Sequence, residues 1–91
     1  MSSTELWKSV FLRWPPAIAR KGIVMNLLGE AMPFKAFMVS AEAVLLERTN
    51  PDTLGARYLL VPYEQIACVK FVDPLGTQAF AHFGMEGKLT T

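Results

Sequence analysis

The side chains that most often carry chemistry are scarce in this chain. It has one cysteine, Cys68, and one histidine, His82, among 91 residues. Cys68 lies between Ala67 and Val69 in an apolar run, which is typical of a packed side chain rather than a nucleophile. One cysteine and one histidine are too few for a structural metal site. The sequence therefore predicts neither a metal site nor a catalytic thiol–imidazole pair.

Glu42 and Glu47 are the carboxylates that come closest to an acid–base pair. Their spacing puts them on opposite faces of a strand, and no third group is placed beside them. The chain also lacks a phosphate-binding loop and a dinucleotide fingerprint. We therefore expect a protein without catalytic residues and without a cofactor, not an enzyme.

The composition favours self-assembly over the binding of a strongly charged partner. The chain is 52% hydrophobic and 19% charged, with a net charge of +1. So much apolar surface in a single small domain indicates a subunit interface. One cysteine suits a reducing compartment, and no apolar run is long enough to span a membrane, so we expect a cytoplasmic protein.

The N-terminus has the pattern of a short amphipathic helix. Ser2 and Glu5 have the spacing of a capping box. Trp7, Phe11 and Trp14 form an apolar stripe at helical spacing, and a pair of prolines follows it directly. We expect a helix over residues 4–13, which is too short to be stable alone and must dock on the rest of the domain.

Short apolar runs fill the next part of the chain, and turn residues separate them. These runs predict five strands within residues 20–72, at 22–28, 32–39, 43–47, 57–61 and 66–72. The expected fold is mainly β: an N-terminal helix, then a five-stranded, strongly bent antiparallel open barrel. This domain covers residues 1–74. Residues 75–91 form a tail that is either flexible or docked through Phe80 and Phe83.

Two segments of this pattern resemble the Sm-like family. The first runs from Ile23 to Gly29 and on to the apolar triplet Val44–Leu46. The second is the stretch VPYEQI, from Val61 to Ile66, in which an acidic residue and an amide precede an isoleucine. The resemblance covers about residues 4–72, and it implies a small open barrel that assembles into rings and binds RNA.

The chain departs from the family where the family binds uridine. Phe34 stands near the place of a glycine, and Ser40 takes the place of an aspartate. Pro62 and Tyr63 replace an arginine–glycine pair, and the lysine–histidine pair of the bacterial RNA chaperone falls on Tyr63 and Glu64. The resemblance thus supports the scaffold more than the RNA-binding mode.

On this basis we expect a nucleic-acid site at Ser40, Glu42, Tyr63 and Gln65. Tyr63 would stack on a base of single-stranded RNA, since stacking needs no particular base sequence. The alternative is that Tyr63 packs on the next subunit, because interfaces favour tyrosine.

We also expect a subunit interface. By the family resemblance, the fourth strand of one copy pairs with the fifth strand of the next. The apolar side chains expected there are those of Leu59, Val61, Val69 and Phe71. A head-to-tail contact that closes gives a cyclic homo-oligomer, of about five to seven copies by analogy with the family.

Three functions stay open at this point. The first is an RNA-binding ring of the RNA-chaperone type. The second is a ring of the same fold that acts as a structural or protein-interaction module without nucleic acid. The third is a monomeric adaptor with an unrelated five-stranded barrel.

Overall fold

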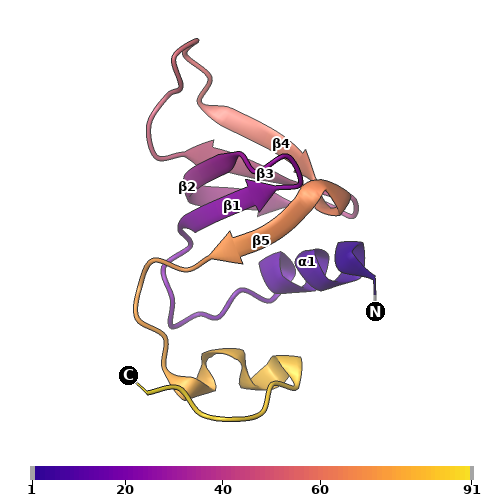
Figure 1. Ribbon diagram of the computed structural model, residues 1–91, viewed down its shortest axis with the longest axis vertical. Coiled ribbons are helices and arrows are strands. Elements are labelled where there is room, and N and C mark those ends of the chain that lie inside the picture. The colour runs from indigo at the N-terminus through magenta and orange to yellow at the C-terminus, as the bar shows by residue number, and fades with distance from the viewer. Residues whose placement is uncertain (1, 91) are drawn as a thin grey trace.

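The structure is a computed structural model that describes residues 2–90, apart from the side chains of Thr77, Gln78 and His82. A helix is followed by four strands, a one-turn 3-10 helix, a fifth strand and a final 3-10 helical segment (Figure 1). The elements are α1 (Ser3–Leu12), β1 (Gly22–Asn26), β2 (Ala31–Val39), β3 (Ala43–Arg48), β4 (Tyr58–Pro62), η1 (Tyr63–Gln65), β5 (Ile66–Lys70) and η2 (Thr77–Phe83). The predicted fold class is confirmed: a mainly-β chain with an N-terminal helix and a five-stranded antiparallel sheet that stays open.

The start of α1 follows from its capping residue. The Ser2 Oγ accepts a hydrogen bond from the backbone N–H of Glu5 at 3.1 Å, which satisfies one of the free donors of the first turn. The last helical residue is Leu12, one position before the predicted end at Arg13. The two prolines that follow stop the helix, because the residue before a proline is pushed out of the α region.

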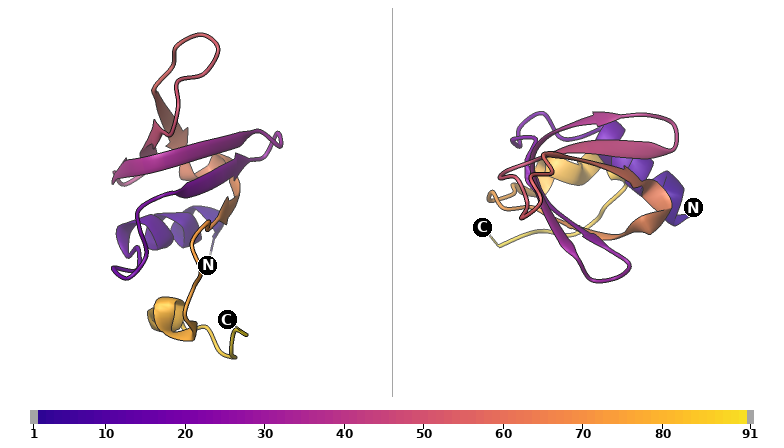
Figure 2. Two further views of the ribbon diagram at one scale, coloured as in Figure 1. Left: turned by 90° about the vertical axis from the view of Figure 1, so that its left-hand side faces the viewer. Right: turned by 90° about the horizontal axis from the view of Figure 1, so that it is seen from above.

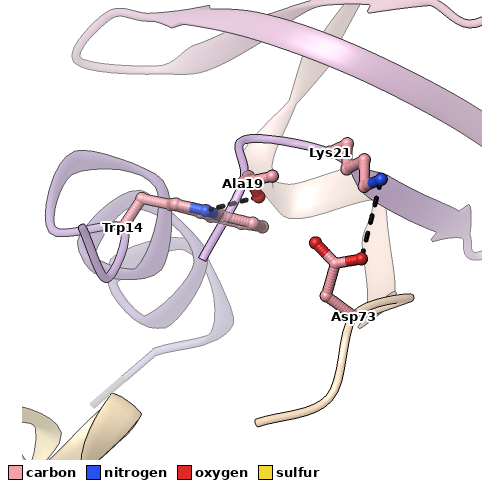
Figure 3. Close-up of polar contacts among 4 residues, drawn as sticks. All are labelled: Trp14, Ala19, Lys21 and Asp73. Atoms are coloured by element: carbon pink, nitrogen blue, oxygen red, sulfur yellow. Dashed lines mark hydrogen bonds and ion pairs between the residues drawn. The ribbon is translucent and has the colours of Figure 1, made fainter. Parts of the chain in front are cut away.

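Trp14 fixes the turn that leads from α1 toward the sheet. Its indole Nε1 donates to the carbonyl oxygen of Ala19 at 3.2 Å (Figure 3). Further along, the ammonium of Lys21 lies 3.6 Å from the carboxylate of Asp73, so the residue before β1 is linked to the segment after β5. The guanidinium of Arg20 lies 3.8 Å from the ring centre of Phe37 and donates to the Phe37 carbonyl oxygen at 3.0 Å. The connection between helix and sheet is therefore tied down at several points.

The sheet has the strand order β4-β3-β2-β1-β5, and every neighbouring pair is antiparallel. Strands β1 to β4 follow one another as hairpins, while β5 returns to pair with β1. Register shifts occur at Met25/Asn26 and at Phe34/Ala36, and such bulges bend a strand. Seen from above, the strands curve around a common centre, and α1 lies below them (Figures 1 and 2). The two edges of the curved sheet, β4 and β5, are not paired with each other.

All five predicted strands are present, and their ends differ most at two places. β1 ends at Asn26 rather than at residue 28, because Leu27 and Leu28 form the turn into β2. β5 ends at Lys70 rather than at residue 72, and the ring of Phe71 packs against Trp14 with the ring centres 5.0 Å apart.

The core lies between α1 and the inner face of the sheet. Phe11 is its centre on the helix side, with its ring centre 5.0 Å from that of Phe37 and 5.7 Å from that of Trp14. Strands β1 to β4, together with η1 and β5, supply the other buried side chains: Val24, Phe34, Phe37, Val44, Leu46, Val61, Tyr63 and Ile66. Within the described residues no charged side chain is buried, so apolar packing stabilises the domain.

The C-terminal segment docks through its phenylalanines. The ring centre of Phe80 lies 5.1 Å from that of Phe71 and 5.4 Å from that of Phe83. The guanidinium of Arg13 lies 5.2 Å from the ring centre of Phe83. Docking through Phe80 and Phe83, one of the two predicted alternatives for the tail, is the arrangement seen, with η2 below α1 in Figure 1.

The loop between β3 and β4 projects from the sheet (Figure 1). The carboxylate of Asp52 accepts hydrogen bonds from the backbone N–H groups of Ala56 at 2.8 Å and Leu54 at 2.9 Å. These bonds favour the ionised carboxylate, and they lower the pKa of Asp52 below its ordinary value. The loop thereby presents Leu54 with 93% of its surface exposed.

Candidate functional site

The structure brings three of the four predicted nucleic-acid-binding residues together at one end of the sheet. Tyr63, in η1, donates its hydroxyl to the carbonyl oxygen of Ser40 at 2.9 Å. The backbone N–H of Tyr63 donates to the carbonyl oxygen of Glu42 at 3.1 Å. Gln65 lies at the other end of η1, where its carbonyl oxygen accepts from the N–H of Leu27 in the β1–β2 turn at 3.0 Å. The spatial grouping is as expected, but the bonds that create it are structural.

The predicted role of Tyr63 in base stacking is wrong for this conformation. Its side chain has 0% exposure and belongs to the core cluster, so no face of the ring is open to a base. Its hydroxyl is already bonded to Ser40, as a buried phenol requires. Burial also raises the pKa of the Tyr63 phenol above its ordinary value, because it disfavours the charged phenolate. Tyr63 therefore fastens η1 to the β2–β3 turn.

Replacing Tyr63 with phenylalanine is expected to lower the free energy of unfolding by about 0.5–1.5 kcal/mol at neutral pH, because one hydrogen bond is lost while the packing stays. The raised pKa adds a pH dependence. The folded state holds the phenol proton more tightly than the unfolded state does. The contribution of this proton to the free energy of unfolding is therefore complete below about pH 10, and it is lost as the pH rises through the pKa of Tyr63 in the folded state. Urea unfolding of both proteins at neutral and at alkaline pH measures the two effects.

Tyr58→Phe is the matched control, since Tyr58 is 59% exposed. If both substitutions weaken the domain equally, the bond between Tyr63 and Ser40 does not have the role assigned to it.

The other predicted contact residues are exposed, but their surroundings do not favour an anion. The hydroxyl of Ser40 is engaged in the β2–β3 turn, where it donates to the Ala43 carbonyl oxygen at 3.0 Å and accepts from the Ala43 N–H at 3.2 Å. A hollow of about 480 Å³ lies beside this turn. Its lining contains two carboxylates and no basic side chain: Thr4, Glu42, Ala43, Pro62 and Glu64. Phosphate groups are attracted by lysine and arginine, so this hollow is poorly suited to a nucleic-acid backbone.

The described residues contain no arrangement that indicates a metal site. No three histidine, cysteine, aspartate or glutamate side chains come together among them. Cys68 is a free, half-buried cysteine on β5, and the side chain of His82 lies outside the described part of the chain.

The four side chains predicted for the subunit interface point inward rather than outward. Val61 is 6% exposed and belongs to the core. Leu59, Val69 and Phe71 are partly buried and pack against the same cluster. These side chains therefore pack in the core of their own subunit, and the interface predicted at these four residues stays a prediction that depends on backbone pairing of the strands. Side chains alternate along a strand, so the outward positions of β4 are Tyr58 and Leu60, which are 59% and 72% exposed.

The backbone edges on which that prediction rested are nevertheless open. Within residues 2–90, β4 pairs only with β3, and β5 pairs only with β1. Each edge strand therefore presents a row of backbone groups that no neighbouring strand satisfies.

The apolar outer face of the sheet was not predicted. Met38, Leu45 and Leu60 lie side by side across β2, β3 and β4, and all three point away from the core. The signal was available: each of these strands has adjacent apolar residues, Phe37–Met38, Leu45–Leu46 and Leu59–Leu60, so apolar side chains occupy both faces.

Comparison of this chain with protein-family models, with curated proteins and with solved structures finds no match. Among residues 2–90, no helix combines the length and the apolar character needed to cross a membrane.

Proposed function

We propose that this chain is a ring-forming module that acts through protein contacts. By the resemblance to the Sm-like family, copies associate head to tail, with β4 of one copy pairing with β5 of the next, and the contact repeats until a ring of about five to seven copies closes. The proposal needs no cofactor, no metal and no catalytic residue. A cytoplasmic location belongs to the same proposal, and the single cysteine is what supports it.

The observation that carries this proposal is the open edge of β4. Natural proteins protect such edges with charged residues, with proline, or with a covering segment. The five residues of β4 include no charge, and their only proline is the last residue, Pro62. Two of the five, Tyr58 and Leu60, are also largely exposed and apolar in character. An edge with these features favours pairing with another strand over exposure to water.

The same features favour protein contacts over RNA. The residue with the best stacking surface is in the core, and the adjoining hollow carries Glu42 and Glu64. With a net charge of +1, the chain also lacks the excess of positive charge typical of nucleic-acid-binding domains.

The mass of the full chain in solution tests the ring. Light scattering coupled to gel filtration, over micromolar concentrations, is expected to give a single mass of at least about five times the 10.1 kDa of the monomer. A monomer throughout that range would refute assembly and would leave the monomeric adaptor.

RNA binding stays a prediction from the family resemblance, and a separate assay tests it. Fluorescence anisotropy with uridine-rich and adenine-rich oligonucleotides, at low and moderate salt, is expected to show no saturable binding. Tight binding that weakens steeply with salt would restore the RNA-binding function, since that slope reports contacts to phosphates.

A further inference from the structure

The outer face of strands β2, β3 and β4 is an apolar surface that the domain itself leaves uncovered. The register puts Met38, Leu45 and Leu60 in one row across the strands, and Ala36, Glu47 and Tyr58 in a second row. We call these six residues the outer patch. Met38 is 70% exposed and Leu60 is 72% exposed. Only one member of the outer patch, Glu47, carries a charge.

Such a surface is unusual for one antiparallel sheet in water. A sheet that packs on a core with one face normally presents polar side chains on the other. Here α1 and the core cover the inner face, where Phe37, Val44 and Leu46 are buried. The outer patch repeats this apolar character on the opposite face, as in a sheet that lies between two layers. No segment within residues 2–90 supplies the second layer over this face.

Two charged side chains at the outer patch indicate what kind of surface covers it. Lys35 is exposed at the bulge of β2, next to Ala36, and Glu47 is the cross-strand neighbour of Ala36. Neither side chain forms an ion pair or a side-chain hydrogen bond within the described residues. The surface thus offers one unpaired cation and one unpaired anion at its rim, so it is complementary to a second copy of itself.

The two charges are paired when two copies are related by a two-fold axis that runs parallel to the strands, between β2 and β3. It brings β2 of one copy over β3 of the other. Met38 then faces the partner's Leu45, and Lys35 lies beside the partner's Glu47. The contact is isologous, so each pair occurs twice.

The area of the outer patch shows when such a contact is stable. Strand and residue spacings give about 200 Å² per copy, roughly a quarter of what each partner buries in a standard interface. Two isolated copies would therefore not hold together. A ring of about five to seven copies repeats the patch around its axis, and about 1,000–1,400 Å² then becomes available per ring.

We propose that two rings of this protein associate face to face through their outer patches, so that the occupant of each patch is a second copy of the chain. This inference rests on the proposed ring, because only the ring multiplies the patch. The two-fold axes needed lie in the plane between the rings, as in an assembly of dihedral symmetry.

Native mass spectrometry of the full chain tests the inference. The wild-type mass is expected to be twice that of Met38→Lys, because a lysine on the central strand β2 buries a charge against the partner's Leu45 between the rings while the open edges stay intact. Leu28→Lys is the matched control: Leu28 is 83% exposed in the β1–β2 turn, outside the patch, and its substitution is expected to keep the wild-type mass. Circular dichroism checks that each variant is folded.

A charge exchange gives a second test that does not alter the apolar side chains. Lys35→Glu alone is expected to halve the mass at low salt, and the double variant Lys35→Glu/Glu47→Lys is expected to restore it. Failure of the double variant to restore the mass would refute the alignment of Lys35 with the partner's Glu47.

The outcomes separate this inference from the proposed function. A wild type with the mass of one ring overturns the inference and leaves the ring intact, as does a Met38→Lys variant with the wild-type mass. A wild-type dimer that Met38→Lys converts into monomers overturns the ring, and with it the inference, because it would show that one patch holds two copies together without a ring. A wild-type monomer overturns both.

Discussion

Replacing Phe11 with alanine is expected to lower the free energy of unfolding by about 3–5 kcal/mol, the usual cost of removing a buried aromatic ring. Phe11 is 1% exposed, and its ring contacts those of Trp14, Phe34 and Phe37. A domain of this size has a total stability of about 5–14 kcal/mol, so the loss is a large part of the whole. The helix α1 also depends on this contact, because ten residues do not form a stable helix alone.

Urea unfolding followed by circular dichroism measures this loss. Leu12→Ala is the control, since Leu12 adjoins Phe11 but is 54% exposed, and we expect it to cost well under 1 kcal/mol. Equal losses in the two variants would show that α1 does not dock through Phe11.

Two edge variants are expected to abolish the ring, and a mixture of them should restore one contact. Tyr58→Lys/Leu60→Lys places charges on β4, and Ala67→Lys places one at an exposed position on β5. Lysine on an edge strand is a natural protection against pairing. Each variant alone is therefore expected to have the mass of a monomer.

The mixture tests the head-to-tail geometry itself. The β4 variant retains an open β5, and the β5 variant retains an open β4, so together they can form one contact but cannot close a ring. Gel filtration with light scattering is expected to show a heterodimer. Leu54→Lys is the control, because Leu54 is 93% exposed in the loop between β3 and β4, which projects from the sheet (Figure 1), and this variant should keep the wild-type mass. A mixture that stays monomeric would argue that β4 and β5 do not recognise each other.

Local rules were enough to predict the elements of the fold. The Ser2 cap and the proline pair delimit α1, and the apolar runs between turn residues locate all five strands. These signals act over a few residues and depend little on the rest of the chain. The ends of β1 and β5 were less predictable, because Leu27 and Phe71 are apolar and look like strand residues, while tertiary contacts turn the chain there.

The orientation of side chains could not be predicted in the same way. In β4, apolar residues follow one another from Leu59 to Val61, so alternation does not tell which of them face the core. The choice is made by the register with β3, where Val61 lies opposite the buried Val44. Leu59 and Val61, the β4 residues predicted for the interface, thus lie on the inner face of the strand.

Tyr63 illustrates the same limit for a turn residue. An aromatic residue that follows a proline in a short connection is typical of an exposed position. The structure instead turns its side chain into the core, where the Ser40 carbonyl accepts its hydroxyl. That partner lies 23 residues away in the sequence, so local pattern could not reveal it.

The strand order has a further consequence, for the sequence of events during folding. Pairing of β1 with β2, of β2 with β3 and of β3 with β4 closes only the loop between consecutive strands. Pairing of β1 with β5 joins Ile23 to Lys70 and must close most of the domain in one step, at a larger cost in chain entropy. We expect this closure to be the last and slowest step. Until it occurs, β5 is not in place as an edge, so a partly folded copy would have only one of the two edges that the proposed ring requires and could not be built into that ring.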